Sequence, residues 1–304
     1  MVFKKLLAAL GVGGPSVDTV LTNPATRPGL SLEGQVLIRG GDHPVDIEHV
    51  ALGLVTQMEV EGGDTEFQAA TEFHRVVVSE GFHLAAGQEL SIPFSFPVPW
   101  ETPITTVFGQ HLHGMVMGLR TELAVARAVD KGDLDPVQVH PLPAQEAVLD
   151  AFGRLGFQFK GADLEHGHIR GLPQTLPFYQ EIEFYAAPAY AHACREVEVT
   201  FVTTPQAVDV VLEIDGGSHD IYLHFQVPHT DTTTDWAQYI DSWFQSTVLP
   251  NAHLFHGGGH KHEESHGSGL AGVIGGAALG FVGGMVAGEV LEEVAEEIFE
   301  DEEE

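Results

Sequence analysis

The sequence predicts an all-β protein with two antiparallel β-sandwich domains, followed by a separate tail. Three observations lead to this prediction. Segments that alternate apolar and polar side chains recur from residue 17 to about residue 230. Gly and Pro separate these segments at short, regular distances, as is typical of β-sandwiches. After Pro250 the alternation stops and the composition changes abruptly to His, Gly and Glu.

The first predicted domain covers residues 1–135. Its segment 89–96 shows a clear period of two and ends in prolines, which indicates a half-buried strand. The segment Asp130–Pro136 is expected to be a hinge between the domains. Its three aspartates lack the ligand spacing and the downstream Glu of a calcium loop, so we interpret them as turn residues. They are Asp130, Asp133 and Asp135, and strands are expected at 17–21, 32–39, 46–59, 67–78, 82–85, 89–96 and 115–129.

The chain opens with a short amphipathic segment. Its apolar run ends in Gly11–Pro15 without a small-x-small cleavage site, so no secretion is expected. We expect a helix that packs on the first domain, in preference to a membrane anchor, because the apolar residues fall on one helical face. These residues are Phe3, Leu6, Leu7 and Leu10.

The second predicted domain covers residues 136–250 and is also a β-sandwich. A helix is expected over Gln145–Leu155, and a closing amphipathic helix is expected after the capping residues Thr232–Asp235. The apolar stripe of the closing helix consists of Trp236, Ile240, Trp243 and Phe244. Strands are expected at 156–163, 179–186, 196–203, 208–214 and 221–227.

Net charge limits the partners. The formal charge is -31, and the 304 residues include only 13 Lys and Arg. Such a chain repels phosphate backbones and anionic bilayers and has no basic stripe, so we expect protein partners and no nucleic acid. The single cysteine cannot form an intrachain disulfide, which suits a reducing compartment, and a cytoplasmic location is expected.

Four stretches resemble the bacterial sporulation-control family of the Spo-zero-M type. The most specific is Leu119–Lys131, which continues to Val137–Pro143, and the others are Phe3–Leu21, Ile92–Pro103 and the helix from Asp235. The resemblance covers about residues 1–248. It implies an arrestin-like pair of β-sandwiches, no catalytic activity, and regulation of sporulation or cell development through protein contacts. It carries over no catalytic residue, and the tail lies outside it.

Catalytic signatures are scarce. The sequence has no Gly-x-Ser-x-Gly, no phosphate-binding Gly-rich loop followed by Lys-Ser/Thr, and no His-Glu-x-x-His. On a strand, Cys194 and His192 would share a face, but Cys–His nucleophile pairs usually join distant segments, so we favour a small core residue. We therefore predict no catalytic residue, and a hydrolase without a known motif is the least favoured alternative.

Two His-x-His pairs have a spacing that some zinc sites use, because both imidazoles of a pair project to one side of a strand. Neither motif supplies the third ligand that a zinc site needs, so solvated histidines are favoured. The pairs are His111 with His113 and His166 with His168.

The tail begins with a His-rich linker, residues 251–268. Flexible imidazoles beside carboxylates bind Zn, Ni or Cu loosely, but the same composition also makes a soluble tether, which we favour. The linker supports an alternative hypothesis, a metal-responsive or metal-storing protein with loosely bound Zn, and no other cofactor is predicted. Its histidines are His253, His256, His260, His262 and His266.

Residues 269–304 are predicted to form a glycine-zipper helix and an acidic tail. The charge-free segment Leu270–Gly288 would make a helix about 28 Å long, close to the hydrocarbon thickness of a bilayer. Its glycines would cost about 7 kcal/mol in helix propensity, so lipid or a second helix must compensate. Self-association or membrane-inserted packing, transient membrane contact and a disordered tether all stay open. The glycines at every fourth position are Gly272, Gly276, Gly280, Gly284 and Gly288.

The final residues alternate an apolar stripe with glutamates at helical spacing and end in five acidic residues, Glu300–Glu304. A docking stripe and a solubilising tail are equally compatible with this pattern. Taken with the features above, the sequence predicts a non-catalytic regulatory scaffold or adaptor that works through protein–protein contacts. The tail is expected to mediate homo-oligomer formation or membrane contact.

Overall fold

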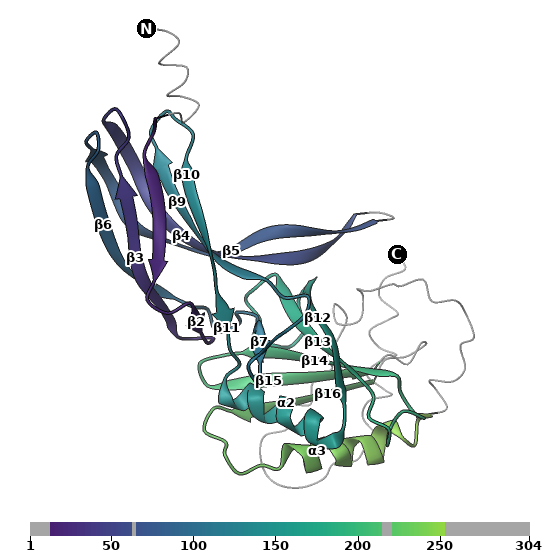
Figure 1. Ribbon diagram of the computed structural model, residues 1–304. Helices are drawn as coiled ribbons and strands as arrows, with labels where there is room; N and C mark the ends of the chain where they lie inside the picture. Colours follow the sequence, from purple (N-terminus) through teal and green to yellow (C-terminus); the bar gives the residue numbers. More distant parts are fainter. Residues whose placement is uncertain (1–12, 63–64, 215–220, 253–304) are drawn as a thin grey trace. The chain divides into compact units, whose positions relative to one another are not determined.

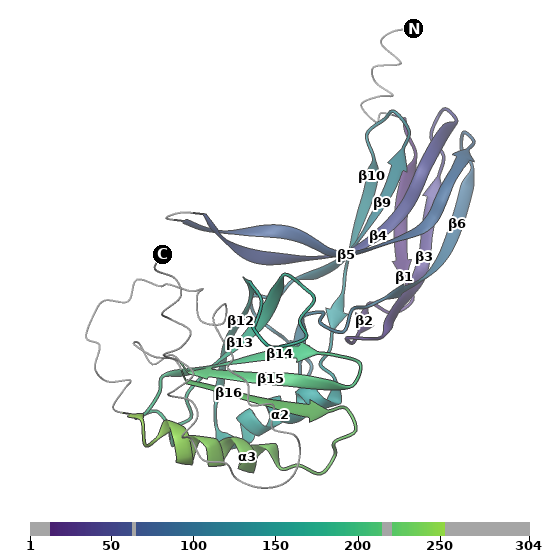
Figure 2. The same ribbon diagram turned by 180° about the vertical axis from the view of Figure 1, so that it is seen from behind.

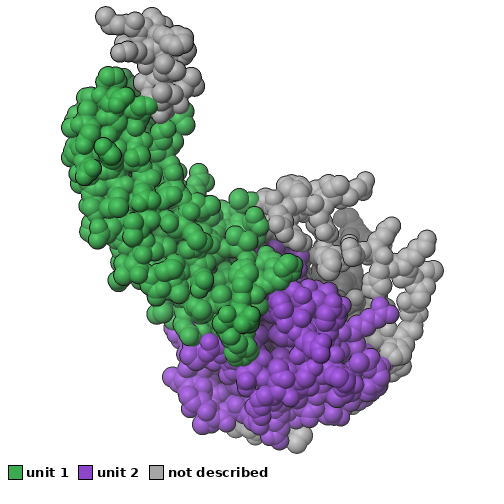
Figure 3. Space-filling model, in the orientation of Figure 1, with its two compact units in different colours: residues 1–141 green, residues 142–304 purple. Residues whose placement is uncertain are grey.

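The computed structural model describes residues 13–62, 65–214 and 221–252 (Figure 1). The predicted N-terminal helix, the His-rich linker, the glycine zipper and the acidic tail lie outside these residues. The chain divides into two compact units, Met1–Pro141 and Leu142–Glu304 (Figure 3). The first unit contains several sheets and the second contains one, and each unit has its own buried apolar residues.

Two antiparallel sheets build the first unit. One has the strand order β1-β3-β6 and the other has the order β10-β9-β4-β5. Two short ladders join β2 (Ala25–Thr26) to β11 (Gln138–Val139) and β7 (Thr106–Val107) to β8 (Gln110–His111). The main strands are β1 (Ser16–Leu21), β3 (Ser31–Arg39), β4 (Val45–Gly62), β5 (Thr65–Leu84), β6 (Glu89–Pro97), β9 (Met117–Val125) and β10 (Lys131–Pro136).

The interior of the first unit lies between these two sheets. Alternate residues of β3 are buried, as the period-two pattern of a half-buried strand requires. The hydroxyl oxygens of Thr19 on β1 and Thr121 on β9 lie 2.6 Å apart in the interior and form a hydrogen bond from one sheet to the other. The first unit is therefore a sandwich, as the sequence predicts.

A long hairpin extends beyond the four-stranded sheet. Strand β9 pairs with β4 only between Ile47 and Thr56. Beyond this point β4 pairs with β5 alone, from Gln57 opposite Ala70 to Gly62 opposite Thr65. The two strands therefore continue as a narrow ribbon that projects from their own sheet (Figure 2).

The second unit contains a five-stranded antiparallel sheet with the order β12-β13-β14-β15-β16. Two helices and a short π-helical turn accompany it: α2 (Pro143–Leu155), α3 (Trp236–Trp243) and η1 (Phe244–Val248). The strands are β12 (Gln158–His166), β13 (Phe178–Tyr185), β14 (Glu196–Thr203), β15 (Ala207–Ile214) and β16 (Ile221–Pro228).

Local sequence explains where the helices begin and end. Pro143 opens α2, and the side chain of Gln145 accepts a hydrogen bond of 2.8 Å from the backbone N–H of Leu142. Gly156 ends α2 in a left-handed conformation, with φ of 89°. Asp235 caps α3 by accepting a hydrogen bond from the backbone N–H of Gln238.

Both helices pack on one face of the sheet. The ring of Phe152 on α2 lies 4.8 Å from that of Phe184 on β13. Trp236 on α3 stacks on Phe225 of β16 with ring centroids 5.0 Å apart. The apolar stripe that the sequence predicts for the closing helix is therefore its buried side.

The predicted all-β class is confirmed, because antiparallel sheets form most of the described chain. The second unit departs from a two-sheet sandwich in one respect: its described residues form one five-stranded sheet, and α2 and α3 cover a face of it. The predicted hinge Asp130–Pro136 is wrong. Residues Lys131–Pro136 form β10, whose pairing with β9 makes them part of the first sandwich.

Candidate functional site: a strained turn and a surface groove on the first unit

The turn between β7 and β8 is strained. Its two central residues, Phe108 and Gly109, both have positive φ, of 49° and 75°. This conformation suits Gly and Asn, while a bulky side chain such as Phe is disfavoured there because its Cβ crowds the backbone. The strands on either side nevertheless pair in register, Val107 opposite Gln110. The hairpin therefore holds an aromatic residue in a conformation that it would otherwise avoid.

Packing does not explain the strain. The Phe108 side chain is 61% exposed, so the residue does not serve as core. Strained backbone positions tend to persist where function requires a side chain to be held in one place. A rigid, exposed aromatic residue is also the kind of anchor on which protein–protein interfaces concentrate their binding energy.

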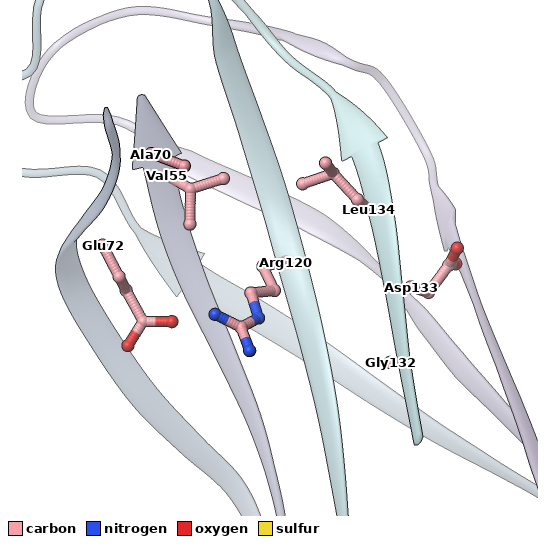
Figure 4. A pocket seen from close by; sticks show the side chains of 7 residues that line it. All are labelled: Val55, Ala70, Glu72, Arg120, Gly132, Asp133 and Leu134. Atoms are coloured by element: carbon pink, nitrogen blue, oxygen red, sulfur yellow. The ribbon is translucent and has the colours of Figure 1, made fainter. Parts of the chain in front are cut away.

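A groove of about 490 Å³ crosses the outer face of the four-stranded sheet (Figure 4). Glycines account for the hollow, because outward positions on β4, β9 and β10 carry no side chain at Gly53, Gly118 and Gly132. A Cβ at Gly53 would lie 2.3 Å from the Glu72 carboxylate, and one at Gly118 would lie 2.7 Å from the Leu134 side chain. The residues that line the groove are Val55, Ala70, Glu72, Arg120, Gly132, Asp133 and Leu134.

Arg120 is the cation of this groove. It projects from β9 towards the side of the groove where Glu72 lies (Figure 4). No carboxylate of the described residues forms an ion pair with its guanidinium, although Glu72 and Asp133 line the same hollow. Leu134, directly opposite Arg120 in the register of β10 and β9, is 61% exposed. The groove thus offers a planar, fivefold hydrogen-bond donor beside an apolar side chain.

A polar network stiffens the sheet next to the groove. Arg75 Nη2 lies 2.8 Å from Glu122 Oε1, and Arg75 Nη1 lies 3.4 Å from Glu72 Oε1. His49 Nε2 lies 3.1 Å from the same Glu122 oxygen. The hydrogen bond from Arg75 lowers the pKa of Glu122 and raises the pKa of Arg75. Arg75 is therefore engaged within the sheet, in contrast to Arg120.

Cys194 does not form a nucleophile pair with His192. The two residues lie in a turn between β13 and β14, so the two-residue spacing of a strand does not apply to them. The Cys194 thiol is buried and donates to the backbone carbonyl of Tyr190 at 3.9 Å, while His192 is exposed. Burial raises the pKa of Cys194 to about 11, so the thiol stays protonated and unreactive near neutral pH.

Neither His-x-His pair gains a third ligand within the described segments. The histidines of both pairs are exposed, and the sets of three groups close enough to share an ion contain only carboxylates. The pairs are His111 with His113 and His166 with His168.

Two of the three aspartates of the predicted hinge, Asp130 and Asp133, accept hydrogen bonds from the backbone. Asp130 Oδ1 accepts a hydrogen bond from the Val125 N–H at 3.0 Å, which closes the turn between β9 and β10. Asp133 Oδ2 accepts one from the Thr19 N–H at 2.8 Å, which joins β10 to β1. Burial raises the pKa of Asp135, and the nearby charge of Asp133 adds to this effect.

The predicted tail sites are not placed by the structure. The five histidines of the linker, from His253 to His266, and the five zipper glycines, from Gly272 to Gly288, lie outside the described residues. In the described part of the chain, none of the helices has the length and apolar character needed to cross a bilayer.

Sequence analysis missed both surface features. The hairpin was not predicted because Phe-Gly is not one of the pairs, such as Asn-Gly or Asp-Gly, that mark a two-residue turn, and only the backbone angles show that Phe108 is strained. The outward glycines of the groove come from three different strands, so their alignment depends on strand register, which the sequence does not reveal.

The architecture first defines a class: an antiparallel β protein of two compact units. Residues 3–217 match the family model described as Spo0M, SpoOM protein, and the chain therefore belongs to this family. The resemblance predicted from the sequence is confirmed.

Two relatives agree with this assignment. The sporulation-control protein Spo0M of Bacillus subtilis (strain 168) is 33% identical over 215 residues, which cover 70% of this chain and 80% of that protein. A crystal structure of Spo0M from Bacillus subtilis matches with a TM-score of 0.68 and 26% sequence identity. That match covers 77% of this chain and 98% of the other.

Proposed function

We propose that this protein is a non-catalytic regulatory scaffold in the control of sporulation or cell development, and that it acts by binding other proteins. Membership of the Spo0M family supports a role connected with sporulation. The strained and exposed Phe108 supports the binding mechanism, because an anchor of this kind has a function only when a partner covers it.

The geometry of the turn suits an anchor for three reasons. The side chain is large and apolar, so its transfer into a pocket of the partner is favourable. The two-residue loop between paired strands restricts its motion, so little conformational freedom is lost on binding. The strain is confined to the turn, whose flanking strands still pair.

The groove at Arg120 supplies a second contact of different chemistry. A guanidinium without an ion-pair partner inside the described chain can bind a carboxylate of another protein with two parallel hydrogen bonds. The exposed Leu134 beside it can pack against an apolar residue of the same segment. We therefore expect the groove to select a partner segment that places an acidic residue next to an apolar one.

The test replaces Phe108 with Asn, a residue that tolerates positive φ, in cells that carry the gene. We expect Phe108→Asn to keep the fold and to lose the proteins that co-purify with the wild-type chain, together with a fall in spore counts. The matched control is Leu30→Asn, another exposed apolar residue of a turn in the first unit, 54% exposed. The proposal fails if Phe108→Asn recovers the same proteins at the same level as the control.

The tail enters the proposal as an association device. We propose that residues 269–304 mediate self-association or membrane contact through the glycines at every fourth position. Removal of residues 251–304 is expected to reduce the sedimentation coefficient by more than the lost mass explains, or to release the protein from membrane fractions. Unchanged sedimentation and fractionation would contradict any association role.

A further inference from the structure

One face of the sheet in the second unit collects carboxylates. Along β13 and β14, the residues that face α2 and α3 are mostly apolar, with Gln180 as an exception, whereas the alternate residues on the opposite face are largely acidic. Strand register brings these acidic residues side by side. Glu183 is directly opposite Glu198, Glu198 is opposite Glu213, and Asp163 is opposite Glu181. Like charges directly opposite each other destabilise a sheet.

The carboxylates are close enough to share an ion. One oxygen each from Glu181, Glu198 and Glu213 lie within 4.8 Å of one another. Asp163 and Glu165 form a second such set with Glu181, on the β12 side. We call the three residues Glu181, Glu198 and Glu213 the carboxylate cluster.

The Lys160 ammonium, beside the cluster, is already engaged on two sides. Lys160 Nζ lies 2.9 Å from Glu183 Oε1 and 2.6 Å from Glu196 Oε2. These two carboxylates flank the cluster on β13 and β14. A single ammonium cannot neutralise these two carboxylates and the cluster at the same time, so Lys160 alone does not balance the charge of the cluster.

A loop packs beside the cluster on this face of the sheet. Ile169, in the connection between β12 and β13, is buried against Tyr179, Val202 and Val211. The side chain of Gln174 fixes the loop with four hydrogen bonds to backbone groups, from the Ile169 N–H and to the carbonyls of Gly167, Leu176 and Phe178. The loop adds an apolar wall, which strengthens electrostatic interactions at the cluster.

A second observation points to a ligand. Thr200 is 1% exposed, and its hydroxyl has no hydrogen-bond partner within the described chain. Its strand position places it on the cluster face, opposite Glu181 and two residues from Glu198. A buried hydroxyl without a partner is costly unless something binds it.

We propose that the carboxylate cluster binds one divalent cation that prefers oxygen ligands, Ca²⁺ in the first place, with the Thr200 hydroxyl as a neutral ligand. Ca²⁺ holds oxygens at about 2.4 Å, so two ligands on opposite sides of the ion are about 4.8 Å apart. The spread of the three carboxylate oxygens fits this limit. Mg²⁺ holds its ligands at about 2.1 Å and requires a tighter octahedron.

Protons are the competing way to neutralise the cluster. Burial, together with the charges of Glu213 and Glu183, raises the pKa of Glu198 to about 8, and burial with the charge of Glu198 raises the pKa of Glu181 well above its usual value. If a cation neutralises the cluster, added metal should bind saturably, whereas a cluster neutralised by protons should not bind it. The experiment below distinguishes these two cases.

The test uses Tb³⁺ as a luminescent substitute for Ca²⁺ in the full-length chain. Tyr222 donates a hydrogen bond of 3.0 Å to Glu213 Oε1, so an ion at the cluster lies close to a tyrosine that can transfer excitation energy to it. Residues 253–304 contain neither Tyr nor Trp, so ions that bind to the acidic tail lack such a donor in their own segment. We expect saturable Tb³⁺ emission that Ca²⁺ displaces.

Variants locate the signal. Glu181→Gln combined with Glu198→Gln is expected to weaken Tb³⁺ binding at least about tenfold, and Thr200→Val about tenfold. The matched control, Glu33→Gln combined with Glu89→Gln, removes two exposed carboxylates of the first unit and is expected to change nothing. Circular dichroism checks that each variant is folded, and Thr200→Val keeps the test valid if the double variant is not.

Three outcomes would overturn the proposal. They are the absence of saturable emission, emission that both cluster variants leave unchanged, and emission that falls equally in the control. Displacement by Mg²⁺ at lower concentration than by Ca²⁺ would overturn the preference for Ca²⁺.

Discussion

The two faces of the sheet in the second unit come from the same strands and follow opposite rules. On one face, mostly apolar residues such as Phe184 and Val199 are buried, and Phe184 packs against Phe152 of α2. On the other, glutamates are held side by side and largely buried. The comparison shows that alternate residues of one strand can have opposite effects. Those on one face stabilise the fold, and those on the other face lower its stability. Faces of the second kind are where function is expected.

The largest effect is expected on the helix-covered face. Phe152 is fully buried, and its ring lies 4.8 Å from those of Phe157 and Phe184. Phe152→Ala should lower the free energy of unfolding by about 3–5 kcal/mol, because a cavity replaces the ring. Denaturant unfolding measures this loss. The control is Arg154→Ala, on the exposed side of the same helix. A comparable loss of unfolding free energy in the control would show that burial against the sheet is not what makes Phe152 important.

The carboxylate face should respond to pH in the opposite sense to ordinary surface carboxylates. Because the pKa of Glu198 is raised to about 8 in the folded state, the native protein holds a proton that the unfolded chain releases above about pH 4.5. In chelator, the free energy of unfolding should therefore fall by about 3 kcal/mol between pH 5 and pH 8. Glu198→Gln should flatten this slope, and a slope that is unchanged in the variant would assign the effect to other groups.

Lys160 should matter more at high pH than at low pH. It bridges Glu183 and Glu196 at 2.9 and 2.6 Å, and its own pKa is raised by these hydrogen bonds despite its partial burial. Lys160→Met should lower the free energy of unfolding by about 2 kcal/mol at pH 8, because the nearly buried Glu183 carboxylate loses its cation. At pH 5 the loss should be smaller, because Glu198, whose pKa the Lys160 charge lowers from a value that burial raises to about 8, is then protonated and no longer interacts with the ammonium as an ion. Equal losses at both pH values would mean that only the packing of the lysine stem counts.

The smallest expected effect concerns Thr200. In chelator, Thr200→Val should raise the free energy of unfolding by about 1 kcal/mol, because it removes a buried hydroxyl without a partner and keeps the side-chain shape. With Ca²⁺ present, the gain should disappear as binding weakens. Thermal unfolding with and without Ca²⁺ measures both values, and a loss of stability in chelator would show that the hydroxyl has a partner after all.

Local patterns predicted most of the fold. The period of two located β6, β14 and β16, strand-like composition located the other strands of the second unit, and the capping residues before Trp236 located α3. These features depend on residues that are close together in the sequence, so one sequence is enough to predict them. The Asp- and Gly-rich segment at 130–136 was misinterpreted as a hinge because its composition is typical of turns, whereas pairing with β9 makes it a strand.

The carboxylate cluster could not be predicted in the same way. The alternating glutamates at 181, 183, 196 and 198 were visible, but alternation normally places such residues in solvent. Their convergence depends on the register of three strands and on the loop fixed by Gln174, and both are non-local. Several like charges on consecutive strands are the sequence signal that would have suggested a cluster of carboxylates.

The hydrogen bonds of Gln174 have a consequence for how the acidic face can evolve and be engineered. A neutral carboxamide holds the loop, and it neither gains nor loses a proton in the range where the neighbouring glutamates titrate. The hydrogen bonds that hold the loop beside the cluster therefore do not depend on the protonation state of the glutamates. Substitutions of the glutamates can therefore change the charge of the cluster while Gln174 still holds the loop. Conversely, a substitution of Gln174 can weaken the hold on the loop and leave every ionisable group in place.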